Sequence, residues 1–84
     1  MPEEKLIGRV SHYYDHIHVA ILDLTDTLIV GQTLHFKGAT DDCHQVVSQM
    51  QIDHQDIQSA KAGESVGIRV DEKLHENDRV FAVA

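Results

Sequence analysis

The residues best suited to chemistry lie in one short segment, 12–18. It contains the imidazoles of His12, His16 and His18 together with the carboxylate of Asp15. His16 and His18 project to the same side of an extended strand, and a hairpin would return His12 to the same end of the domain. These groups are zinc ligands, but the fixed Cys and His spacings of zinc motifs are absent. We therefore predict no metal or other cofactor. If the segment does hold a metal ion, these three histidines are its candidate ligands; the alternative is a solvated loop with incidental affinity for metal ions.

Two adjacent tyrosines, Tyr13 and Tyr14, lie in the same segment. Alternation along a strand would send one ring into the core and the other to the surface. The exposed ring, beside Arg9, could stack on a base or contact a protein through an apolar ring with a polar tip. A purely structural role for both rings is the alternative. The predicted binding surface comprises Arg9, His12, Tyr13, Tyr14, His16 and His18.

Catalytic groups are harder to find. Cys43 and His44 are neighbours, but neighbours on a strand point to opposite faces and could not exchange a proton. Asp41 and Asp42 fall in an expected turn, where carboxylates are solvated. No Gly-x-x-x-x-Gly-Lys phosphate loop occurs. We predict no catalytic residues and no enzymatic activity.

Length and charge limit what the chain could bind. Its 84 residues suffice for one hydrophobic core, and the formal net charge is −7. No two basic residues are adjacent, which argues against strong binding to nucleic acid phosphates. Strand pairing could still gather Arg9, Lys37 and Arg69 on one face. The single cysteine, Cys43, excludes an internal disulfide, and no signal peptide or membrane-spanning run is evident. We expect a cytoplasmic protein with no membrane association.

The elements that must position these groups read as β-strands. Apolar runs alternate with short turn clusters, which is the pattern of an all-β domain. One region, Cys43–Ala62, fits strand alternation and helical spacing about equally. The remaining predicted strand segments are Lys5–Tyr13, Ile17–Leu24, Leu28–Lys37, Ser65–Val70 and Arg79–Val83.

Several short motifs, taken in order along the chain, resemble those of a known family, the second domain of elongation factor Tu and its relatives. The pattern also resembles free-standing translation elongation factor-like small proteins and the domain that ends U32 peptidase-like proteins. The motifs are Ile7-Gly8-Arg9-Val10, Val19-Ala20-Ile21-Leu22, Leu28-Ile29-Val30-Gly31-Gln32-Thr33-Leu34, Val47-Ser48-Gln49-Met50-Gln51 and Ala60-Lys61-Ala62-Gly63-Glu64-Ser65-Val66-Gly67-Ile68.

This resemblance implies a closed six-stranded Greek-key barrel over residues 5–84, preceded by an N-terminal tail, 1–4. It implies a strand at Gln45–His54, tight turns at Gly31 and Gly63, and a close strand crossing at Gly8. The family often has Gly-Asp before its last strand. This chain has Asn77-Asp78 there, and Asn tolerates the left-handed backbone conformation.

For function, the resemblance implies a non-catalytic binding module related to translation factors. We expect it to dock on a protein or ribonucleoprotein partner, and the acidic charge suits a basic partner. Two alternatives stay open. One is direct, weak binding of tRNA or other RNA, and the other is a histidine-rich protein that responds to metal or pH.

Overall fold

The computed structural model describes residues 4–39 and 42–83, and within them every regular element is a β-strand. The predicted all-β class is therefore confirmed. None of the described residues forms a helix able to cross a membrane. Of the predicted tail, residues 1–3 lie outside the described part, and Glu4 already begins the first strand. The strands are β1 (Glu4–Tyr14), β2 (Val19–Leu24), β3 (Leu28–Ile29), β4 (Thr33–Lys37), β5 (Asp42–Val46), β6 (Met50–Ile52), β7 (Gln55–Ile57), β8 (Ser59–Ala60), β9 (Ser65–Arg69) and β10 (Arg79–Val83).

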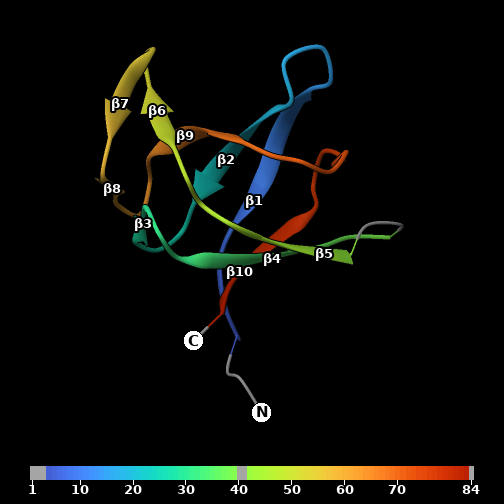
Figure 1. The fold of residues 1–84 in the computed structure, drawn as a ribbon. Coiled ribbons are helices and arrows are strands. Elements are labelled where there is room, and N and C mark those ends of the chain that lie inside the picture. The colour runs from blue at the N-terminus through green and yellow to red at the C-terminus, as the bar shows by residue number, and fades with distance from the viewer. Residues whose placement is uncertain (1–3, 40–41, 84) are drawn as a thin grey trace.

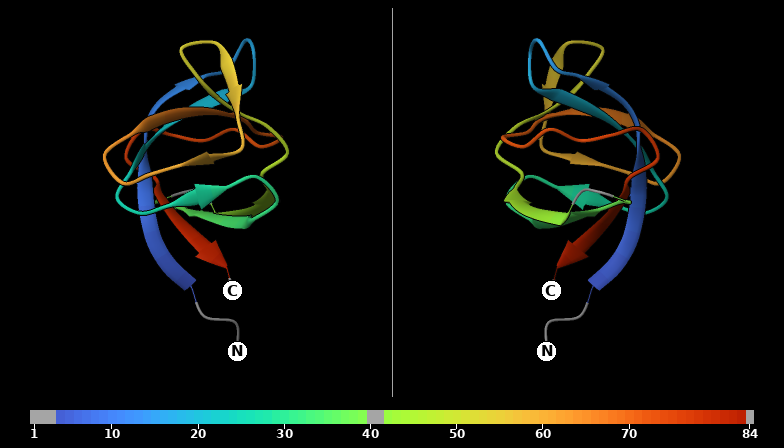
Figure 2. Two further views of the ribbon diagram at one scale, coloured as in Figure 1. Left: turned by 90° about the vertical axis from the view of Figure 1, so that its left-hand side faces the viewer. Right: turned by 90° about the vertical axis from the view of Figure 1, so that its right-hand side faces the viewer.

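Eight strands form one antiparallel sheet in the order β5-β4-β10-β1-β2-β9-β6-β7, and β3 pairs with β8 in a small second sheet. The long strand β1 joins the two halves, because it pairs with β10 on one side and β2 on the other. Glu4 pairs with Val83, so the first and last strands meet at one end of the domain. The tips of the β1–β2 and β6–β7 hairpins lie at the opposite end (Figures 1 and 2).

Alternation along the strands builds the core. In β2, Ala20, Leu22 and Leu24 are buried while the residues between them are half-buried. Gly8 on β1 permits close approach to β2, since a Cβ there would lie 2.5 Å from the carbonyl oxygen of Asp23. The chain reverses at Gly31 and Gly63 with φ of 101° and 88°, a region that costs glycine little.

The predicted strand Gln45–His54 is wrong in its extent. The structure divides it between β5 and β6, with residues 47–49 unpaired as strand. Val46 is exposed and Val47 is buried, and the Val47 N–H donates to the Gln32 carbonyl. The chain thus turns inward at Val47, and a second turn at Asp53 and His54, with φ of 52° and 64°, begins β7.

The predicted closed six-stranded Greek-key barrel is not established by the strand pairing. Within residues 4–39 and 42–83, no pairing joins β5 to β7 at the two edges of the eight-stranded sheet. One side chain does bridge from β5 to the end of β9. The amide of Gln45 donates to the Arg69 carbonyl at 2.6 Å and accepts from the Asp71 N–H at 2.9 Å.

Candidate functional site

A cluster of ionisable side chains lies on the face of β4 opposite the core. Leu34 and Phe36 point inward, so His35 between them points outward. His35 is nevertheless only 8% exposed, because side chains from neighbouring strands cover it. The strand register sets His44 of β5 on one side of it and Phe81 of β10 on the other.

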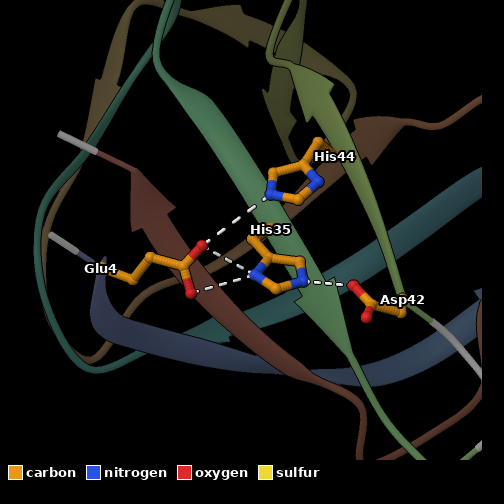
Figure 3. A network of polar contacts seen from close by, with 4 residues as sticks. All are labelled: Glu4, His35, Asp42 and His44. Atoms are coloured by element: carbon orange, nitrogen blue, oxygen red, sulfur yellow. Dashed lines mark hydrogen bonds and ion pairs between the residues drawn. The ribbon is translucent and has the colours of Figure 1, made fainter. Parts of the chain in front are cut away.

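His35 lies between two carboxylates (Figure 3). Its Nδ1 is 2.8 Å from Oε2 and 3.0 Å from Oε1 of Glu4, and its Nε2 is hydrogen-bonded to Oδ1 of Asp42. The ring of His44 stacks on that of His35, with centroids 4.1 Å apart and planes 11° from parallel. Nε2 of His44 is 3.8 Å from Oε2 of Glu4. These four residues, from β1, β4 and β5, are called the His35 cluster below.

The two carboxylates favour the charged form of His35. The hydrogen bond to Glu4 and then the bond to Asp42 raise the pKa of His35, and together they outweigh its partial burial, which lowers it. In turn the hydrogen bond from His35 lowers the pKa of Asp42. An imidazolium that donates both N–H groups has no lone pair for accepting a proton from a nucleophile. In this arrangement His35 is not a general base.

The predicted binding residues are placed near the β1–β2 hairpin tip, with one exception. Tyr13 packs against the core and Tyr14 is 46% exposed, so the predicted division of the two rings is confirmed. His12 contacts the ring of Tyr14 at 4.5 Å between centroids, and its Nδ1 lies 3.3 Å from Oε1 of Glu76. Arg9 lies farther along β1, where it pairs with Arg79.

His12, His16 and His18, the candidate ligands to test although no metal site was predicted, do not form a ligand group in the described part of the chain. His16 is fully exposed, with Nε2 3.9 Å from Oδ1 of Asp15. His16 and His18 line a shallow groove of about 390 Å³ with Arg69. The residues whose ligand atoms do gather, within 4.8 Å of one another, are Glu4, His35 and His44.

Strand pairing also gathers basic residues that are separate in the sequence. Arg9 pairs with Arg79, and Arg79 pairs with Lys37, so three cations form a row across β1, β10 and β4. Asp23 and Asp42 continue the row at either end. Arg69 is not part of it, since it lies in the groove at the hairpin tip. The expected grouping of Arg9, Lys37 and Arg69 is thus corrected to Arg9, Arg79 and Lys37, which we call the basic row.

Comparison with known proteins bears on the function. No family model matches the chain. It is 41% identical over 76 residues to an uncharacterized protease of Methanocaldococcus jannaschii, an alignment that covers 89% of this chain and 19% of the relative. The chain therefore spans about a fifth of the length of that relative.

The solved structures similar to this chain agree on a fold. The C-terminal domain of a candidate U32 peptidase of Geobacillus thermoleovorans superposes with a TM-score of 0.87 at 16% identity, covering 93% of this chain and 91% of that one. A selenomethionine variant of the same domain gives 0.86 at 18% identity, with 90% and 96% covered. The expected likeness to the domain that ends U32 peptidase-like proteins is thus confirmed at the level of fold.

These comparisons correct the functional prediction. We expected a binding module related to translation factors, with the second domain of elongation factor Tu as its model. The relative found is instead named as a protease, and the similar structures are C-terminal domains of a U32 peptidase-like protein. The translation-factor interpretation, which rested on short motifs shared in order, is therefore wrong.

Proposed function

We propose that this chain is a non-catalytic β-domain that works with a peptidase body of the U32 type. The observation that carries the proposal is the 41% identity to a segment that makes up 19% of a protein named as a protease. The fold shared with the C-terminal domain of a U32 peptidase-like protein supports it. In such a protein, most of the chain outside this segment is available to form the peptidase centre.

The described side chains support a non-catalytic role. His35 is enclosed by two carboxylates, so it lacks the acid–base–nucleophile order of a hydrolytic triad. Cys43 packs against the core, whereas the adjacent His44 lies on the outer face in the His35 cluster. The thiol and the imidazole that are neighbours in sequence are thereby separated by the strand itself.

We assign docking to the tip of the β1–β2 hairpin. Tyr14 and Ile17 are 46% and 60% exposed there, and their side chains adjoin hollows, as at surfaces that contact another protein. Two hollows, of about 390 and 450 Å³, share Ile17 and Val19 in their walls. This end of the domain is opposite the end where Glu4 of β1 pairs with Val83 of β10 (Figure 2). A peptidase body joined to the domain at the β1–β10 end would therefore leave the hairpin tip accessible.

Two structural expectations belong to the same proposal. We infer that the curled sheet closes as a six-stranded Greek-key barrel, which the Gln45 bridge to Arg69 and Asp71 supports. A cytoplasmic location stays a prediction from the single cysteine.

The docking is tested with the Methanocaldococcus jannaschii protease from which the matching segment has been deleted. We expect this chain, added in trans, to form a one-to-one complex in sedimentation analysis. Ile17→Gln should weaken the complex at least tenfold, because a buried aliphatic contact is worth about 1.5–3 kcal/mol. Ile29→Gln is the matched control, because Ile29 is also an exposed isoleucine, 49% exposed, but lies on β3 and not in the hairpin.

Two results would overturn the proposal. A deleted protease that folds, by circular dichroism, yet forms no complex with this chain would remove the docking role. Cleavage of casein by the purified chain alone, abolished by a substitution in the chain, would remove the non-catalytic role.

A further inference from the structure

The His35 cluster is separate from the hairpin tip, and its donor atoms are arranged for more than a salt bridge. Glu4, His35 and His44 each offer one ligand atom, and the three atoms lie within 4.8 Å of one another. They come from three strands, so the sheet, and not a flexible loop, fixes their backbones. Two imidazole nitrogens and one carboxylate oxygen form a donor set typical of zinc and related transition metals.

Asp42 orients His35 for this role. It is hydrogen-bonded to Nε2 of His35, which leaves Nδ1 facing the Glu4 carboxylate. Metal-binding histidines commonly donate their second ring N–H to a carboxylate, which fixes the ring and increases its basicity as a ligand. The Asp42–His35–Glu4 arrangement has this form, with a proton at the position where a metal ion would lie.

The separations of the two histidine nitrogens from the Glu4 oxygen are close to those a metal requires. Metal–ligand bonds of about 2 Å at tetrahedral angles place neighbouring ligand atoms about 3.3 Å apart. Nδ1 of His35 is 2.8 Å from Oε2 of Glu4, slightly less, and Nε2 of His44 is 3.8 Å from the same oxygen, slightly more. The near-parallel stacking means that the His44 ring must swing toward the ion, and its side chain is 56% exposed, which permits this.

We propose that Glu4, His35 and His44 bind a divalent transition metal ion, with zinc as the preferred one, and that Asp42 is the positioning residue of the site. Three protein ligands leave a fourth position for water or for a donor from another molecule. Binding releases the Nδ1 proton of His35 to the solvent, because the metal takes the lone pair that holds it.

Calorimetric titration of the metal-free chain with zinc tests the proposal, with cobalt absorption as a probe of coordination geometry. We expect one ion per chain, micromolar or tighter binding at pH 7.5, and visible cobalt bands of tetrahedral intensity. Glu4→Gln and His44→Gln should each weaken binding at least tenfold. Asp42→Asn should weaken it about 10–100-fold, as expected for loss of a carboxylate behind a ligand.

The control is the double variant His12→Gln/His16→Gln, which removes two imidazoles from the hairpin segment and leaves the His35 cluster intact. It should bind zinc like the original chain. Repeating the titration in buffers of different ionisation enthalpy should show about one proton released per ion at pH values where His35 is charged.

The proposal is overturned if zinc binds no more tightly than about millimolar at pH 7.5. It is also overturned if Glu4→Gln and His44→Gln, shown by circular dichroism to be folded, bind like the original chain, or if the double variant loses the binding. Because all these measurements use the isolated chain, their outcome is independent of whether it docks on a peptidase.

Discussion

Arg79 on β10 lies directly opposite Arg9 on β1, so two guanidinium side chains extend from adjacent strands on the same face. Like charges in this position destabilise an antiparallel pair. Lys37 lies on the other side of Arg79 and adds to the repulsion. The domain thus concentrates three of its seven basic residues in one row, although its net charge is −7.

We therefore predict that Arg79→Gln stabilises the domain at low ionic strength. The gain should be a few tenths to about 1 kcal/mol, and it should shrink in high salt, which screens exposed charges. Urea unfolding at two salt concentrations measures it. Arg9→Gln is the control, because Arg9 also pairs with Asp23 and its removal leaves that carboxylate without the cation opposite it. A loss of stability in Arg79→Gln that does not vary with salt would contradict the prediction.

The strands that carry the basic row could be predicted from the sequence, but the alignment of its residues could not. Each strand that carries one of its residues was predicted, because apolar alternation and turn residues are local signals. The left-handed backbone of Asn77, with φ of 72°, also followed from its residue type. The alignment of Arg79 with Arg9 and Lys37 depends on strand register, which no single segment encodes.

The His35 cluster should make stability depend on pH. The pKa of His35 is raised above its ordinary value of 6.5, so its contribution is complete below about pH 6.5 and is lost as pH rises through the raised value. The pKa of Asp42 is lowered from 3.8, so its contribution is present above about pH 4 and is lost as pH falls through the lowered value. The cluster therefore stabilises the fold most between about pH 4 and 6.5.

We expect His35→Gln to lower the urea midpoint clearly at pH 6 and much less at pH 9, measured with a chelator present. The ionisable groups that face His35 are Glu4 from β1 with Asp42 and His44 from β5. The matched control is His16→Gln, since the His16 side chain is fully exposed. An equal loss for His35→Gln at both pH values would show that packing, and not charge, explains the effect.

Gly8 should tolerate no side chain. A methyl group there would lie 2.5 Å from the Asp23 carbonyl oxygen and would force β1 and β2 apart. We expect Gly8→Ala to cost about 1–3 kcal/mol in thermal or urea unfolding, the range for overpacking. Gly67→Ala is the control in another strand, because its nearest neighbours, side-chain atoms of Ile21 and Val19, lie at 3.4 and 3.5 Å. Comparable losses in the two variants would refute the steric explanation.

The Gln45 bridge gives a test of how the sheet curls. Gln45→Ala removes two hydrogen bonds, to the Arg69 carbonyl and from the Asp71 N–H. We expect a loss of about 1 kcal/mol and faster hydrogen exchange at the Asp71 amide. Gln49→Ala is the control, because it removes only one hydrogen bond, to the Asp56 side chain, which Gln51 also contacts. Unchanged exchange at Asp71 in Gln45→Ala would show that the bridge does not hold β5 in place.

The candidate site was missed from sequence for a related reason. Alternation along the predicted segment Leu28–Lys37 is enough to place His35 on the outer face, but it does not show that Glu4, 31 positions earlier, covers it. Asp42 was expected in a solvated turn, whereas it begins β5 and bonds to His35. The other expected turn acid, Asp41, lies outside the described residues. The local signal in the sequence is the dense run of histidines at 12–18, whereas the gathered ligands come from three separate strands.

The pairing of Glu4 with Val83 also has a mechanical consequence. A pull applied at these two residues loads the β1–β10 ladder from one end, so its hydrogen bonds open one after another like a zip, and not all together in shear. The Glu4–His35 bond lies at the first position to open. A domain tethered at this end would therefore open at a low stretching force. The contacts of the His35 cluster would be the first to carry that force.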